Sequence, residues 1–312
     1  MSAAEINAHD HGLSKIVAAW VSLSAVLLFE LLFSSSRSQA GVFIDGGAWP
    51  SRTIPYEICL QGKTSKDCGD EQKFTTKEYL SVLNVIGELC SEFKQHDLFR
   101  LVSRRVPGSE KIRDGAYVVI RKDPERTSSE TAAVGFQGNS KAHIITIGFA
   151  YPPQDFDDYK NRLIHEFGHV LGLLHEQVHP DRDKYLQVPD KDYNAASEQD
   201  KRQWARACKK AEQNKCQTYT EWVFLSRRAF YSIAGSFDFR SMMFYAFGKD
   251  ASKNDPLGMK VTLTAEGKKL GIAQNADNPG SATKFGPEDL KTLEEAYKGK
   301  PLSLDGDPGE CR

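Results

Sequence analysis

The chain has 312 residues, of which 40% are hydrophobic, enough to bury one large core or two smaller ones. Its 41 basic residues are nearly balanced by 42 acidic ones, so the composition gives no electrostatic basis for binding nucleic acid. The sequence shows no internal repeat and no low-complexity tract of note, which argues against a repeat architecture.

The first forty residues have the composition of a targeting segment. An apolar run extends from Ile16 to Phe33 and is interrupted by one charged residue, Glu30. It is followed by small and polar residues ending at Ser38-Gln39-Ala40, which is typical of a signal-peptidase site. A membrane anchor is the alternative, because the run is just long enough to span a bilayer. We therefore predict a signal peptide, or a signal anchor, at residues 1–40.

Two helices can be predicted from local signals outside the central part of the chain. Thr75 and Glu78 have the spacing of a capping box, which marks a helix start. Apolar residues then recur at helical spacing from Tyr79 to Phe93, so we predict a long amphipathic helix packed on a sheet. Near the C-terminus, Gly286-Pro287-Glu288 begins a second helix with its apolar residues on one face.

The middle of the chain contains short β-rich runs separated by Gly, Asn and Pro. They predict three strands, at Tyr117–Arg121, Ala133–Phe136 and His143–Ile147, and then a helix over about 156–171. We expect His143 to be exposed on one face of its strand.

The helix over about 156–171 carries the most informative motif. His165 and His169 are four residues apart, so a helix places both imidazoles on one face. That spacing lets both bind one Zn²⁺, while Glu166 reaches a metal-bound water instead. Gly172 can adopt the left-handed conformation that turns the chain, so that His175 returns as a third ligand. Three protein ligands leave a position open for water, as in catalytic zinc sites.

The motif is longer than a bare H-E-x-x-H, which occurs by chance. H-E-x-x-H-x-x-G-x-x-H is the metzincin pattern and should be followed by a methionine turn, for which Ser241–Tyr245 supplies Met243. The alternative is that the four histidines between residues 165 and 179 are ordinary core or surface residues. Their clustering, with glycine and glutamate correctly placed, argues against it.

At several separated points the sequence resembles the astacin family of zinc endopeptidases, from Trp49 to Tyr297. Glu176 follows the third histidine as in the family. Other matching segments are Trp49-Pro50, Ile54-Pro55-Tyr56, Asp181-Arg182-Asp183, Asp238–Tyr245 and Ala282–Phe285. His179, Phe244 and Leu173 depart from the family pattern, which bears on substrate preference and local packing rather than on the chemistry.

The resemblance implies an α+β fold of the metzincin (zincin) type, in a two-lobed catalytic domain over residues 41–300. The N-terminal lobe would hold a mixed twisted sheet and long helices, and the C-terminal lobe would be mostly irregular and end in a helix. The last strand before the zinc helix would form the upper rim of the cleft, where an extended peptide could pair by strand addition. A tail at residues 301–312 would be tied down by Cys311.

The resemblance also implies a secreted zinc endopeptidase that acts on protein or peptide substrates, and we expect a monomer. Glu166 would be the general base for water activated by zinc. Tyr245 would be an additional zinc ligand that swings out to hydrogen-bond the oxyanion. Met243 would lie beneath the metal, and the ammonium group of Gly41 would approach Glu176 after cleavage. A membrane-tethered sheddase with the same chemistry and a catalytically silent binding module are the alternatives; a membrane contact is expected only if the N-terminal segment stays uncleaved.

Six cysteines, all after residue 40, suit an oxidising compartment. Cys59 and Cys68 are close in sequence, as are Cys208 and Cys216, and the pair Cys90–Cys311 resembles the family's bridge from the first helix to the C-terminus. Six cysteines permit fifteen pairings, so other connectivities remain open. Free core thiols are the alternative, and no cysteine spacing here is that of a thiolate zinc site.

Overall fold

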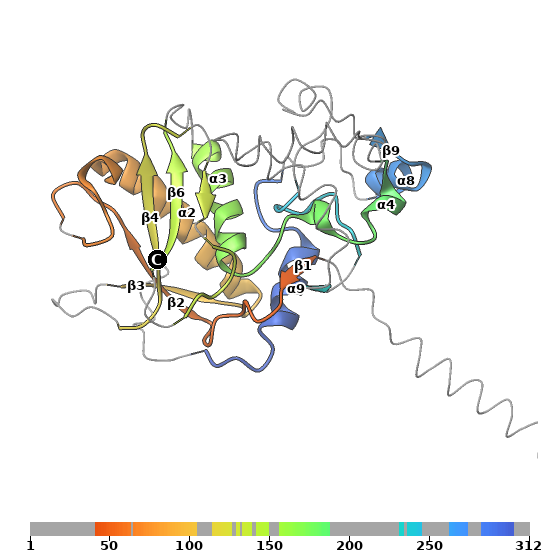
Figure 1. Ribbon diagram of the computed structural model, residues 1–312, viewed down its shortest axis with the longest axis horizontal. Helices are drawn as coiled ribbons and strands as arrows, with labels where there is room; N and C mark the ends of the chain where they lie inside the picture. Colours follow the sequence, from red (N-terminus) through yellow and green to blue (C-terminus); the bar gives the residue numbers. More distant parts are fainter. Residues whose placement is uncertain are drawn as a thin grey trace, which may run out of the picture. The chain divides into compact units, whose positions relative to one another are not determined.

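The computed structural model describes residues 41–63, 65–104, 114–126, 129–131, 133–138, 142–149, 156–187, 231–233, 236–244, 262–273 and 282–302 (Figure 1). All of them lie in one unit, Gln39–Arg312. The segment 1–40, Tyr245 and three of the cysteines (Cys208, Cys216 and Cys311) lie outside the described residues, so the predictions made for them stay predictions. No helix within the described ranges is long and apolar enough to cross a membrane.

A five-stranded sheet with the order β3-β2-β4-β6-β5 organises the part before residue 150. Its strands are β2 (Thr53–Ile58), β3 (Arg100–Ser103), β4 (Tyr117–Asp123), β5 (Glu130–Thr131) and β6 (Ala142–Gly148). Neighbours pair in parallel except β5, which pairs antiparallel with β6 at one edge. Parallel strands need long crossover connections, and the helix α2 supplies the one between β2 and β3.

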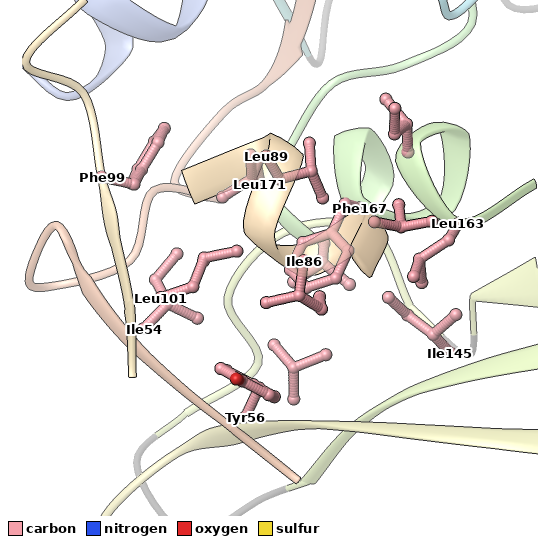
Figure 2. Close-up of a cluster of buried hydrophobic side chains, with 14 of the residues drawn as sticks. Ile54, Tyr56, Ile86, Leu89, Phe99, Leu101, Ile145, Leu163, Phe167 and Leu171 are labelled. Carbon is pink, nitrogen blue, oxygen red and sulfur yellow. The ribbon is translucent and has the colours of Figure 1, made fainter. Parts of the chain in front are cut away.

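Two long helices, α2 (Thr76–Gln95) and α3 (Phe156–Val170), contribute to the same hydrophobic core as this sheet. Figure 2 shows the contact, in which Ile86 of α2 and Phe167 of α3 lie near strand residues such as Ile145. The capping box of α2 is confirmed: Glu78 donates its N–H to Thr75 Oγ1, and Thr75 donates its N–H to Glu78 Oε2 at 2.7 Å. The long helix predicted after residue 75 is therefore present with its predicted start.

A second, smaller apolar cluster contains Tyr117 and Val119 of β4, which alternate with the core residues Val118 and Ile120 and so point to the other face of the sheet. The disulfide Cys59–Cys68 belongs to this cluster and confirms the predicted pair. Cys90 of α2 is also disulfide-bonded, and its partner lies outside the described residues.

The described residues after α3 form short elements and a closing helix, α9 (Pro287–Ala296). The strands pair as β1 with β8 and β7 with β9, both antiparallel. The remaining elements are β1 (Val42–Ile44), η1 (Asp70–Gln72), η2 (Glu176–Val178), α4 (Arg182–Tyr185), β7 (Leu186–Gln187), β8 (Tyr231–Ile233), β9 (Thr262–Leu263) and α8 (Ala265–Ala273). The mixed sheet, long helices and closing helix confirm the α+β class, and α9 begins where Gly286-Pro287-Glu288 predicted it.

The strand predicted at Ala133–Phe136 is wrong, because the strand in this region is β5 at Glu130–Thr131. Gly135 has a positive φ of 70°, and its N–H donates to the His169 carbonyl at 2.8 Å. Phe136 donates its N–H to Gly47. These backbone groups thus bond to a helix end and a loop instead of a strand ladder.

The prediction that the strand before the zinc helix lies at the rim is also wrong. That strand, β6, lies inside the sheet between β4 and β5. The edge of the sheet on this side is therefore β5. The exposure predicted for His143 is wrong as well, since only 3% of it is accessible. Its ring lies 4.5 Å from the Trp49 ring and stacks on Phe136 at 5.9 Å, between centroids. Aromatic residues from loops thus cover this face of β6.

The turn predicted at Gly172 is confirmed. The helix α3 ends at Val170, and Gly172 has a φ of 101°, which is the left-handed region that favours glycine. The strand β1 forms two backbone hydrogen bonds with this turn. Ile44 donates its N–H to the Gly172 carbonyl at 2.9 Å, and Leu174 donates its N–H to the Val42 carbonyl at 2.8 Å. A Cβ on Gly172 would lie 2.6 Å from the Phe43 ring, so no side chain fits there.

We expect Gly172→Ala to lower the free energy of unfolding by about 2 kcal/mol or more, because it combines left-handed strain with a clash on Phe43. Gly87→Ala is the matched control, since Gly87 lies within α2 with no atom near its missing Cβ, and it should be neutral or slightly stabilising. Chemical unfolding of both variants measures this. Equal effects at the two positions would contradict the account of the turn.

Candidate metal centre

Three histidine side chains converge where α3, the turn after it and η2 meet. Nε2 of His175 lies 3.0 Å from Nε2 of His165 and 3.0 Å from Nε2 of His169. One nitrogen from each ring lies within 4.8 Å of the others. His165 and His169 stand one turn apart on α3, and the left-handed turn at Gly172 brings His175 back to them. The three predicted ligands are therefore brought together.

The other ring nitrogens fix how these imidazoles are protonated. Nδ1 of His165 lies 2.9 Å from the Met242 carbonyl, and Nδ1 of His169 lies 2.9 Å from the Leu173 carbonyl. Carbonyl oxygens only accept hydrogen bonds, so each Nδ1 carries the proton and each Nε2 of a neutral ring presents a lone pair. Two lone pairs thus point at Nε2 of His175, which can supply at most one proton. The three Nε2 atoms thus offer more lone pairs than protons, and a bound cation would accept these lone pairs.

The donor set fits zinc in particular. Nitrogen ligands at 2.0–2.1 Å in a tetrahedral zinc site lie about 3.3 Å from one another, close to the spacing found here. Burial lowers the pKa of His175 to about 3, so its imidazole is neutral, which is the form that binds metals. The group of His165, His169 and His175 could therefore hold a metal ion of this kind.

The predicted general base, Glu166, follows the first histidine on α3 and is mostly buried, with 6% of it accessible. Its Oε2 accepts a hydrogen bond from the Thr131 hydroxyl at 2.7 Å. Thr131 belongs to the edge strand β5, and nothing in the sequence around it identified it as part of the site. The carboxylate of Glu166 is buried, and a hydrogen-bond donor orients it next to a group that could bind a metal. Such a carboxylate is suited to accept a proton.

Met243 packs directly against the helix that carries the histidines. A Cβ on Gly168 would lie 2.4 Å from the Met243 sulfur, so a larger residue there would displace the Met243 side chain from its place against the helix. The Met243 carbonyl also accepts the N–H of Glu176 at 2.9 Å. Met243 thus contacts the helix between His165 and His169, its placement beneath a metal stays a prediction, and Gly168 is a further contributor that the motif does not mark.

A buried carboxylate from α9 holds the segment before Met243. Asp289 accepts the Ser241 hydroxyl at 2.7 Å on Oδ1 and the N–H groups of Met242 and Gly286, each at 2.8 Å, on Oδ2. Met242 is the residue whose carbonyl faces His165. Sequence reasoning missed Asp289, although its place three residues after the helix cap Gly286 is the capping-box position.

Glu176 is completely enclosed next to this carboxylate. Its Oε1 accepts the N–H of Asp238 at 2.8 Å. Burial, followed by the charge of Asp289, raises the pKa of Glu176 well above its usual value. Burial also raises the pKa of Asp289 to about 6, despite the three hydrogen bonds that favour its charged form.

Two expectations about this region remain predictions. Tyr245 follows Phe244 directly but lies outside the described residues. Gly41 lies against Thr292 of α9, one turn after Asp289, because a Cβ on Gly41 would come within 2.3 Å of the Thr292 hydroxyl. The approach of its amino group to Glu176 after cleavage therefore stays a prediction.

Residues 157–298 match the model of the Astacin peptidase family. This segment, a little under half of the chain, is similar to the astacin peptidases and contains all three histidines of the candidate centre. Over 111 residues the chain is 31% identical to astacin-like metalloprotease toxin 2 of Loxosceles intermedia, covering 36% of the chain and 33% of the toxin. Over 162 residues it is 25% identical to seminal metalloprotease 1 of Drosophila melanogaster, covering 51% and 53%. The chain thus spans a third to about half of the length of these curated astacin relatives.

Among solved structures, the chain is similar to high choriolytic enzyme 1, a hatching enzyme zinc-protease from the medaka fish Oryzias latipes. The two share 16% identity with a TM-score of 0.45, over 84% of this chain and 96% of that one.

The raised pKa of Asp289 predicts a definite pH dependence of stability. Between its unfolded value near 3.8 and its folded value near 6, the folded protein binds more protons than the unfolded chain, so stability falls as pH rises through this window. The difference corresponds to about 3 kcal/mol. Relative to Asp289→Asn, the parent protein should therefore lose stability between pH 4 and pH 6. Melting curves of both proteins measure this, and parallel pH profiles would contradict it.

Proposed function

We propose that this protein is a secreted zinc endopeptidase that hydrolyses peptide bonds in proteins. The observation that carries the proposal is the convergence of imidazole nitrogens from His165, His169 and His175, with the buried carboxylate of Glu166 next to His165 on α3. This arrangement lies in the segment that is similar to the astacin peptidases. The Cys59–Cys68 disulfide supports an oxidising compartment outside the cytosol.

Each residue of the site has a definite task in this proposal. His165, His169 and His175 hold the zinc ion, which when bound supplies Lewis-acid chemistry to the carbonyl and to water. Glu166 accepts the proton of the attacking water and passes it to the leaving amine. Tyr245, by its place after the methionine turn, donates a hydrogen bond to the oxyanion that develops on the substrate.

The edge strand β5 supports an extended peptide as the substrate. It is one of the two edge strands of the sheet among the described residues, and it is antiparallel to its neighbour β6. A peptide could add to this edge through main-chain hydrogen bonds, which bind many sequences alike. Since Thr131 of β5 contacts Glu166, a peptide on this edge would lie close to the general base.

The N-terminal segment completes the proposal for localisation. Cleavage after Ala40 would release a chain whose first strand, β1, closes over the turn at Gly172. The relatives named above include a toxin and a seminal metalloprotease. Those names describe secreted products, and we extend that localisation to this chain.

The first test is hydrolysis of an unfolded protein by the chain purified from the medium of cells that express residues 1–312. We expect activity that a zinc chelator abolishes and added zinc restores. Glu166→Ala should keep the fold and the metal but lower turnover by at least about 100-fold. Metal analysis of the variant is the control. Activity that survives in Glu166→Ala with zinc bound would overturn the assignment of the base.

A second test concerns Tyr245. We expect Tyr245→Phe to lower kcat by about 10- to 100-fold, since a transition-state hydrogen bond is lost, while the three histidines keep zinc bound. Steady-state kinetics alongside metal analysis measures this. Loss of zinc from the variant, or an unchanged kcat, would contradict the role proposed for the phenol.

A further inference from the structure

The hydroxyl of Thr131 contacts two oxygens of Glu166. It lies 2.7 Å from the side-chain Oε2 and 3.1 Å from the main-chain carbonyl. A threonine has one O–H, so it donates to one of them at a time. The shorter contact has the length of a hydrogen bond from a hydroxyl to a carboxylate, whereas a helix carbonyl is already bonded within its helix. Thr131 therefore donates to Glu166 Oε2.

The strand that carries Thr131 is held firmly in place. Thr131 pairs with Ile145 of the buried strand β6, and its β-branched side chain has few rotamers. Four residues later, Gly135 donates its N–H to the His169 carbonyl at 2.8 Å. The segment after β5 is thus fixed to α3 one turn beyond the Glu166 contact.

We propose that Thr131 is a positioning residue for the general base; this rests on the function proposed above. A glutamate side chain has three rotatable bonds, so it reaches one orientation only when something fixes its carboxylate. The Thr131 hydroxyl supplies such a fixed partner through its hydrogen bond to Oε2.

This arrangement also joins substrate binding to catalysis. The main chain of Thr131 belongs to the edge strand on which we expect the peptide to lie, while its side chain holds the base. The distance between the peptide and Glu166 is then set by one residue rather than by two independent elements. Small displacements of a base cost much of its effect, so such a direct connection has a catalytic consequence.

The test compares two substitutions at Thr131 with a matched one nearby. Thr131→Val keeps the shape and removes the hydroxyl, and Thr131→Ser keeps the hydroxyl. Thr146→Val makes the same change on the adjacent strand, where the hydroxyl accepts a hydrogen bond from Arg121 Nε at 3.3 Å and does not serve Glu166.

In the zinc-loaded protein, we expect Thr131→Val to lower kcat roughly tenfold with KM unchanged, since one hydrogen bond to a charged group is lost. Thr131→Ser should retain most of the activity, Thr146→Val should keep kcat, and all three should bind zinc in full. An unchanged kcat in Thr131→Val, or an equal loss in Thr146→Val, would overturn the proposal.

A second readout needs neither activity nor zinc. In the metal-free protein, Thr131→Val should lower the melting temperature by about 3 °C, and the effect should shrink when Glu166 is already alanine. Equal effects in both backgrounds would overturn the proposal, because they would mean that the hydroxyl acts elsewhere. If the parent has no chelator-sensitive activity but the coupling is found, the proposed function fails, and with it the catalytic consequence, while the hydrogen bond stands.

Discussion

The left-handed turn at Gly172 is the constraint on which the metal centre depends. Two histidines four residues apart on a helix can offer only two ligands, and the third must come from a chain that reverses within a few residues. No side chain fits at Gly172, because the Phe43 ring of β1 fills the space. The strand β1 in turn bonds to the main chain of the turn at Gly172 and Leu174. The N-terminal strand therefore helps to place His175.

The helix α3 packs into the core on one side and carries two histidines of the candidate metal centre on the other. Leu163 and Phe167 lie in the main core with α2 and the sheet, while His165 and His169 face the metal centre. Since an α-helix repeats every 3.6 residues, fixing one side by tight packing also fixes the directions of side chains on the other. The positions of the two histidines are thus set by hydrophobic contacts away from the candidate metal centre. Gly168 adds to this by admitting Met243 between the two histidine turns.

The features that could be predicted from sequence are those whose physical cause is local. The capping box at Thr75, the spacing of His165 and His169 and the glycine turn each depend on neighbours within a few residues. Thr131 and His143 depend instead on partners brought by the fold, so their environments could not be read from their own segments. The strand predicted at Ala133–Phe136 failed for the same reason, because its backbone groups bond to distant carbonyls.

Asp289 shows why such long-range partners matter for the site. It lies more than a hundred residues from His165 in sequence, yet it is connected to that histidine through one residue: it accepts the N–H of Met242, whose carbonyl faces His165 Nδ1. Burial raises the pKa of Asp289, so the charged carboxylate lowers the free energy of unfolding. The hydrogen bond from Met242 to Asp289 thus helps to hold the carbonyl that faces a candidate metal ligand. The closing helix α9 is therefore tied to the metal centre through a buried charge, which makes the geometry of the centre depend on the fold of the whole domain.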